Sequence, residues 1–264
     1  MQRATNTYRP RPQPRSNSVE SEGKSSTNRE KSNDKNNDSS YSHRMRTPFM
    51  KLQAVSRATG SAYIEMEGVK VICGVYGPTS NPRASYSDKG SLSCSVEFAP
   101  FAKTNRRTRE DEQEERAISL LLEEALTVSI QLDKFPKAVI KAWVVILEAG
   151  KGHIAAAISC VSLALADAGI ELYDLVTAAS VGRLSSKIVV DPGEKEYQRS
   201  DYEGSLWIAY MPSLGQITYI SQSGRIDLDA SQKMLELCTE GCIALHSAMR
   251  SCLVESAKKL DRAC

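Results

Sequence analysis

A glycine-containing turn is the first place in this sequence where chemistry could occur. Gly150, Lys151 and Gly152 lie between an apolar run typical of a strand and the start of a helical pattern. Backbone N–H groups and the helix dipole can hold a phosphate at such a point. The turn matches neither the Walker loop, G-x-x-x-x-G-K-[ST], nor the dinucleotide fingerprint, G-x-G-x-x-G. Spacing alone therefore favours a tight turn that needs a positive φ angle.

A histidine follows this turn directly. His153 could act as a general base, but no Ser or Cys nucleophile and no orienting carboxylate stands beside it in the sequence. The other two histidines are His43, near the N-terminus, and His246, in the last helical pattern. A catalytic triad or a histidine-based metal site is therefore not predicted.

Two acidic segments could supply paired carboxylates. Residues 110–115 lie among several arginines, which is typical of the solvated start of a helix. Asp191 ends an apolar run, and a polar loop after it carries Glu194, Glu196, Asp201 and Glu203. Carboxylates of this kind suit Mg²⁺. A surface loop is nevertheless the interpretation that these residues favour by themselves.

Basic side chains gather in two places, a patch at Lys103, Arg106 and Arg107 and the N-terminal segment 1–47. The segment holds ten Lys and Arg against five Asp and Glu, a net charge of +5, whereas the whole chain has 34 against 32, a net charge of +2. The remainder is therefore at −3 and is not a broadly basic nucleic-acid binder. Any RNA contact must come from the local patch, which could reach phosphates, or from the N-terminal segment.

The N-terminal segment has the composition of a disordered chain. Residues 1–47 contain no Leu, Ile, Phe or Trp. Such a segment cannot bury enough apolar area to offset the cost of ordering its backbone, about 1–2 kcal/mol per residue. We expect a disordered basic tail over 1–47, acting as a linker in preference to a binding arm, and a folded domain over 48–264. The tail has no apolar core of a secretory signal, and its acidic residues do not suit a mitochondrial transit peptide.

The cysteines and the hydropathy pattern exclude several further classes. Seven cysteines are scattered along the chain, and the closest pair, Cys238 and Cys242, has no second pair or histidine partners for zinc. The odd number without a secretion signal favours reduced thiols in an intracellular protein. No apolar run is long enough to predict a membrane span. Neither a metal nor a cofactor is expected.

The periodicity predicts nine strands and three helices in an α+β order. Helices are predicted at residues 117–130, 153–167 and 229–259. Strands are predicted at 51–57, 61–66, 69–76, 91–98, 138–147, 174–181, 187–190, 205–211 and 217–221, the fifth of them buried on both faces. The helix at 153–167 is apolar all round and should lie at the centre of the core. Helices layered on mixed β-sheets are the expected architecture.

Several motifs, in the right order, resemble one family. Residues 60–65 and 71–78 resemble the opening of the ribonuclease PH domains of exosome rings, and Ala99-Pro100-Phe101 resembles the segment before that family's first helix. Residues 163–169 are similar to the end of its central helix, and Met211-Pro212 with Gln216-Ile217 also fit. The resemblance covers about residues 49–260. It implies an RNase PH-like domain of the ribosomal protein S5 domain 2-like kind, with the fold of a phosphorolytic exoribonuclease.

The same resemblance implies a degenerate active site. Active members bind phosphate through a Gly-[Ser/Thr]-Arg turn, and Gly152 matches the glycine, whereas His153 and Ile154 stand where the hydroxyl and the arginine would be. An aliphatic side chain cannot replace a charge-assisted, often bidentate contact to phosphate. Ser205 stands where active members place an Asp, and serine is neither a carboxylate ligand nor a suitable acid. The matching positions for a substrate-binding Arg pair are Gln113 and Glu114.

The resemblance therefore predicts a subunit without catalytic activity. Within the family, residues 169–176 look most like one type of ring subunit of the eukaryotic exosome. That implies five related chains in a hetero-hexameric ring, S1/KH-type cap subunits, a separate hydrolytic nuclease, and RNA threaded through the barrel. It also implies a place in the nucleus, nucleolus and cytoplasm. Two alternatives stay open: an active phosphate-dependent 3′-to-5′ exoribonuclease, and a free RNA-binding protein that acts through its tail.

Overall fold

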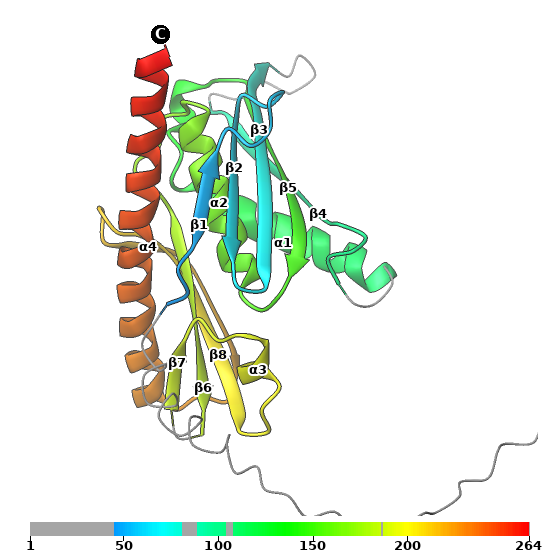
Figure 1. Ribbon diagram of the computed structural model, residues 1–264, viewed down its shortest axis with the longest axis vertical. Helices are drawn as coiled ribbons and strands as arrows, with labels where there is room; N and C mark the ends of the chain where they lie inside the picture. The colour runs from blue at the N-terminus through cyan, green and yellow to red at the C-terminus, as the bar shows by residue number, and fades with distance from the viewer. Residues whose placement is uncertain (1–44, 81–88, 104–107, 186, 264) are drawn as a thin grey trace, which may run out of the picture. The chain divides into compact units, whose positions relative to one another are not determined.

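The structure is a computed structural model that describes residues 45–80, 89–103, 108–185 and 187–263. It is an α+β domain with two sheets and four α-helices in the described part (Figure 1). The helices are α1 (Arg109–Thr127), α2 (His153–Asp167), α3 (Glu194–Tyr197) and α4 (Leu228–Ala263), with one 3₁₀ turn, η1 (Leu132–Lys134). The predicted tail, apart from its last three residues, lies outside the described residues.

The first sheet has five strands in the order β1-β2-β3-β5-β4. They are β1 (Phe49–Leu52), β2 (Gly60–Met66), β3 (Val69–Ser80), β4 (Ser91–Phe98) and β5 (Ala138–Ala149). β4 and β5 run parallel, and the other pairs are antiparallel. Since parallel neighbours need a crossover, α1 makes the connection between β4 and β5.

The second sheet has four antiparallel strands in the order β7-β6-β8-β9. They are β6 (Thr177–Leu184), β7 (Lys187–Val190), β8 (Tyr202–Met211) and β9 (Gln216–Gly224). α4 packs along β6 and β8 with Met234, Cys238 and Cys242, which are fully buried. The helix is long enough to reach β1 of the first sheet as well (Figure 1).

α2 is the central element, as its composition predicts. Every residue from Ala155 to Leu165 is buried, because the helix packs on β2 and β3 of one sheet and on β6 of the other. Small side chains permit close approach: a Cβ on Gly60 would lie only 2.2 Å from the backbone nitrogen of Ala168. Gly169, at φ +71°, ends the helix as predicted, because glycine adopts this conformation without strain.

Three predicted elements need correction. β3 continues past Gly77 and Pro78 to Ser80, because a register shift between Tyr76 and Thr79 removes the need for a ladder hydrogen bond at the proline. β5 is buried on one face only: Trp143 is 47% exposed on the other face, which none of the described helices covers. α1 starts at Arg109, eight residues before the predicted start, so the acidic segment forms its first turn.

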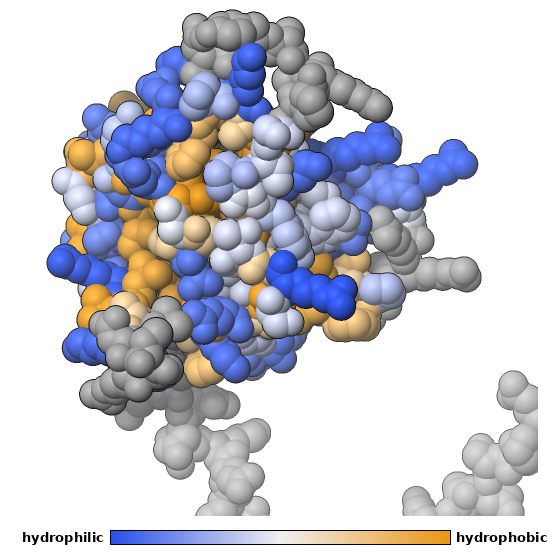
Figure 2. All heavy atoms as spheres, turned by 90° about the horizontal axis from the view of Figure 1, so that it is seen from above, coloured by the Kyte–Doolittle hydropathy of each residue, from blue (hydrophilic) through white to orange (hydrophobic). Residues whose placement is uncertain are grey.

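The remaining differences are at the ends of elements. β1 is shorter than predicted, β6 begins three residues later, and β9 continues through the turn predicted at Ser223 and Gly224. The surface seen in Figure 2 mixes polar and apolar side chains, and apolar ones gather on the side where α4 runs in Figure 1. Within the described residues, no helix combines the length and the apolar character needed to cross a membrane.

Candidate functional site

The Gly150–Gly152 turn delivers the chain from β5 into α2. Gly152 has φ +87° and stands directly before the first residue of α2, which confirms the positive φ predicted here. Gly150 is required for a different reason, since a Cβ on it would lie 2.1 Å from the carbonyl oxygen of Gly68. The turn is therefore fixed by backbone geometry.

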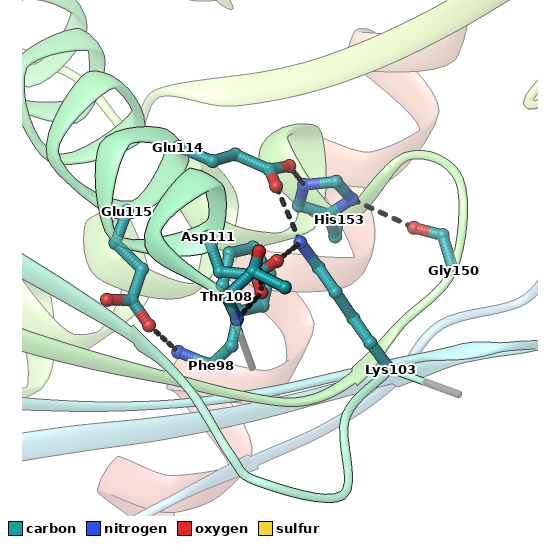
Figure 3. A network of polar contacts seen from close by, with 8 residues as sticks. All are labelled: Phe98, Lys103, Thr108, Asp111, Glu114, Glu115, Gly150 and His153. Carbon is teal, nitrogen blue, oxygen red and sulfur yellow. Dashed lines mark hydrogen bonds and ion pairs between the residues drawn. The ribbon is translucent and has the colours of Figure 1, made fainter. Parts of the chain in front are cut away.

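His153 is held in one orientation at the start of α2. Its Nδ1 lies 2.9 Å from the carbonyl oxygen of Gly150, so Nδ1 carries the proton and donates (Figure 3). The ring packs edge-on against Phe98, with the ring centroids 5.9 Å apart. Its Nε2 is buried and has no hydrogen-bond partner among the described residues, and the Glu114 carboxylate lies 3.9 Å from it. Burial lowers the pKa of His153, so the imidazole is neutral at pH 7.

Lys103 lies between two carboxylates of α1 (Figure 3). Its Nζ is 2.7 Å from Asp111 and 2.5 Å from Glu114, and it stands 4.1 Å from the centre of the Phe98 ring. Lys103 and the backbone N–H of Thr108 lower the pKa of Asp111 to about 2. The charge of Lys103 is thus balanced inside the chain, which sequence reasoning did not foresee. Arg106 and Arg107 lie outside the described residues, so RNA contact by this patch stays a prediction.

The acidic start of α1 is more than a solvated surface. Glu115 is 7% exposed and accepts a hydrogen bond of 2.8 Å from the backbone N–H of Phe98. Gln113 is exposed, whereas Glu114 faces His153 and Lys103. The interpretation of 110–115 as a solvated segment is therefore wrong for its last two residues, because they turn inward toward β4 and the α2 turn.

An ion pair that the sequence did not reveal lies beside Gly152. Arg46 Nε and Nη2 donate to the two carboxylate oxygens of Asp191, at 2.7 and 2.5 Å. Arg46 also donates to the carbonyl oxygens of Glu67 and Lys151. A Cβ on Gly152 would lie 3.4 Å from Arg46 Nη2 and 3.5 Å from Asp191 Oδ1. A cation from the end of the predicted tail is therefore packed against the turn.

This ion pair changes the interpretation of Asp191. Its side chain is 7% exposed, so Asp191 is buried and does not belong to a surface loop. Its φ of +53° is one that Asp tolerates better than most residues. Asp201 pairs with Arg199 at 3.1 Å. Among the described residues, no three His, Cys, Asp or Glu side chains are grouped so that they could share a metal ion.

Ile154 belongs to α2, which packs on β6, and Ser205 belongs to β8, the neighbour of β6 in the second sheet. Ile154 is half-buried and packs against the main core. Ser205 pairs with Gly182 of β6, two residues along from Ser180, whose hydroxyl adjoins the Gly152 turn. Residues opposite each other and residues two apart share a sheet face, so Ser205 and the turn lie on the same face.

Side chains occupy the space between Ser205 and the turn. A Cβ on Gly182 would lie 3.0 Å from Pro192 and 3.1 Å from the ring of Tyr202. Tyr202 packs on Tyr197 of α3, and the Nζ of Lys151 lies 5.1 Å from the centre of the Tyr197 ring. The site therefore combines a neutral histidine, an aliphatic side chain and a serine with paired charges. In the described residues it offers no acid–base pair aimed at a common point.

Comparison with known proteins places this geometry in a family. Residues 44–171 match the RNase PH profile, described as the 3′ exoribonuclease family, domain 1. The chain is 37% identical over 220 residues to the exosome complex component RRP41-like of Arabidopsis thaliana, covering 83% of this chain and 84% of that protein. The chain belongs to the RNase PH family. The predicted α+β fold of that family is confirmed.

Other members of the RNase PH family are similar over the same region. The exosome complex component MTR3 of Homo sapiens is 33% identical, covering 82% of this chain and 85% of the relative. The crystal structure of rice (Oryza sativa) Rrp46 superimposes with a TM-score of 0.70 at 18% identity, covering 81% of this chain and 98% of that one. The structural likeness extends the fold assignment to the C-terminal half, beyond the residues that match the profile.

Proposed function

We propose that this chain is a non-catalytic structural subunit of an RNA exosome ring. Its relatives are exosome components in plants and animals, and they match over more than four fifths of the chain. The observation that carries the proposal is the start of α2. There Ile154 packs into the core where active members present an arginine to phosphate, and Arg46, the nearby guanidinium, is held by Asp191.

In this role the subunit provides binding surfaces for its partners, and the partners carry out catalysis. The other RNase PH-like subunits complete the ring, S1/KH-type cap subunits dock on it, and RNA passes through the barrel to an associated hydrolytic nuclease. The processes served are rRNA maturation, RNA surveillance and mRNA turnover, in the nucleus, nucleolus and cytoplasm. The subunit uses no cofactor of its own.

An active phosphate-dependent exoribonuclease is the second candidate. One observation favours it: the Gly152 turn keeps its positive φ, and the exposed Lys151 leaves a cation beside it. However, Lys151 lies over the Tyr197 ring, and Ser205 supplies no carboxylate. For activity, residues outside the matched motifs would have to bind phosphate and to act as the acid.

Affinity purification of the tagged full-length chain from its own cells tests the proposal. The expected result is stoichiometric recovery of other RNase PH-like chains together with cap subunits, identified by mass spectrometry. Deletion of residues 1–44, which keeps Met45 and Arg46, serves as a second arm, and we expect it to leave this recovery intact. Recovery of the chain by itself would contradict the proposal.

A further inference from the structure

The two sheets end in four edge strands, and three of these are protected against pairing. An open edge presents unpaired N–H and C=O groups, and proteins usually shorten, charge or cover it. β1 and β7 have four residues each, carry Lys51 and Lys187, and have α4 packed against them. β4 is longer and is covered by α1.

α1 covers the free edge of β4 with side chains. The backbone N–H groups of Cys94, Val96 and Phe98 donate to Glu123, Ser119 and Glu115, at 2.7, 3.0 and 2.8 Å. The acceptors are spaced four residues apart, about 6 Å along a helix. The donors are spaced two residues apart, about 6.6 Å along a strand. The two spacings match, so β4 is not available to another strand.

β9 differs from the other three edge strands. It has nine residues, pairs with β8 on one side only, and contains no charged residue. Ile217 and Ile220 are 42% and 54% exposed. Although α1 approaches part of β9, no side chain of the described residues accepts a hydrogen bond from its backbone N–H groups. β9 therefore lacks the charges and caps that close the other edges.

The pairing pattern identifies the groups that point outward. Arg225 N donates to Glu203 O at 3.3 Å, which marks these two residues as a hydrogen-bonded pair. Bonded and non-bonded pairs alternate along an antiparallel ladder. By this alternation from Arg225, Ile220 and Gln222 stand in non-bonded pairs. Their N–H and C=O groups therefore point away from β8, toward the outer edge. The inner face of the strand is fixed, since Tyr219 stacks on Trp207 with ring centroids 5.2 Å apart.

We infer that β9 is an assembly edge, which binds an uncharged edge strand of another RNase PH-like chain and thereby extends the four-stranded sheet across the subunit boundary. This inference rests on the proposed function, which supplies partners of the same fold. The absence of charge along β9 favours a neutral strand as the partner, since a charged one would lose its hydration without a counter-charge. Main-chain hydrogen bonds would supply affinity, and the exposed isoleucines would be covered.

Substitutions on β9 in the full-length tagged chain test this inference. Gln222→Pro removes an outward N–H that makes no hydrogen bond among the described residues, and the side-chain contact that it loses, with Ser231, is exposed. The isolated protein should therefore nearly keep its melting temperature, whereas partner binding should weaken about tenfold or more. Ile220→Lys adds charge to the edge and should do the same. Val128→Lys is the matched control, because Val128 is 55% exposed and lies outside the strand. It should bind as the unmodified chain does.

Amide hydrogen exchange gives a second readout that does not depend on substitutions. In the assembled complex, the amides of Ile220 and Gln222 should exchange at least about tenfold more slowly than in the isolated chain.

Two results would overturn the assembly edge and leave the proposed function standing. One is unchanged exchange, and the other is wild-type recovery of RNase PH-like chains by both β9 variants. If the unmodified chain recovers no such chains, the proposed function fails and the partner named here fails with it. A homodimer of the isolated chain that the β9 variants abolish would assign the edge to a second copy, which also contradicts the inference.

Discussion

At the residue scale, the ion pair between Arg46 and Asp191 determines which charges lie beside the Gly152 turn. Both side chains are largely buried, with 16% and 7% exposed, and two hydrogen bonds join them. Removing one partner of such a pair leaves an uncompensated charge. Arg46→Ala should therefore lower the free energy of unfolding by about 3 kcal/mol, measured by urea denaturation.

A double-mutant cycle provides the control for this prediction. Asp191→Asn removes the charge and keeps a side chain that tolerates the positive φ of this position. The double variant should be more stable than Arg46→Ala, because no buried charge is left unpaired. Strictly additive losses would show that the two residues do not interact.

His153 gives the site a dependence on pH with a defined sign. Burial lowers its pKa below the ordinary value of 6.5, so the unfolded chain binds this proton more tightly than the folded one. The stability contributed by His153 is complete above about pH 6.5 and is lost as the pH falls below it. His153→Gln should flatten the decline in melting temperature between about pH 7.5 and 5.5. A steeper decline in His153→Gln would contradict this assignment.

At the element scale, the hydrogen bonds between α1 and β4 replace a missing strand. Glu123→Ala should leave the N–H of Cys94 without its acceptor and cost about 1–3 kcal/mol of unfolding free energy. Glu124→Ala is the matched control, because its side chain is the exposed neighbour. It should change stability by less than about 0.5 kcal/mol. Equal losses in the two variants would show that the acceptor on α1 is not what stabilises β4.

The elements were predictable where the hydropathy pattern is strong. α2 was located to the residue, because its apolar composition leaves one interpretation and Gly152 and Gly169 mark its ends. β4 and β7 were likewise placed correctly. The start of α1 was missed because its first turn is charged, and those charges serve β4 and Lys103 through contacts between distant segments. Such contacts are tertiary and leave no periodic signal.

The residues of the candidate site were likewise predictable only in part. The turn, His153, Ile154 and Ser205 were identifiable from the motifs and their spacing. The Arg46–Asp191 pair was not, because the two residues are 145 positions apart and Arg46 stands in a segment of disordered composition. The pairing of Lys103 also depends on the fold. The absence of catalytic groups from the site stays a prediction, whereas the ion pairs that lie there became visible only in the fold.

At the scale of the whole molecule, the loss of activity that we propose is distributed over two elements. In this proposal the lost phosphate contact belongs to α2 and the lost carboxylate to β8, where Pro192 and Tyr202 lie against Gly182, the residue that pairs with Ser205. Ile154→Arg should therefore create no phosphorolysis, and removing an apolar contact from the core should cost about 1–3 kcal/mol of stability. Activity from this single change, measured as phosphate-dependent shortening of RNA, would contradict the role assigned to Ser205.

The central claim is that this RNase PH-like chain performs no chemistry. It is tested most directly by incubating the purified full-length chain with 5′-labelled single-stranded RNA, Mg²⁺ and saturating inorganic phosphate. The products are then analysed for shortened RNA and released nucleoside diphosphates. The account predicts no shortening that depends on phosphate, at any pH between about 6 and 8. Phosphate-dependent release of nucleoside diphosphates, lost on Gly152→Ala, would contradict it.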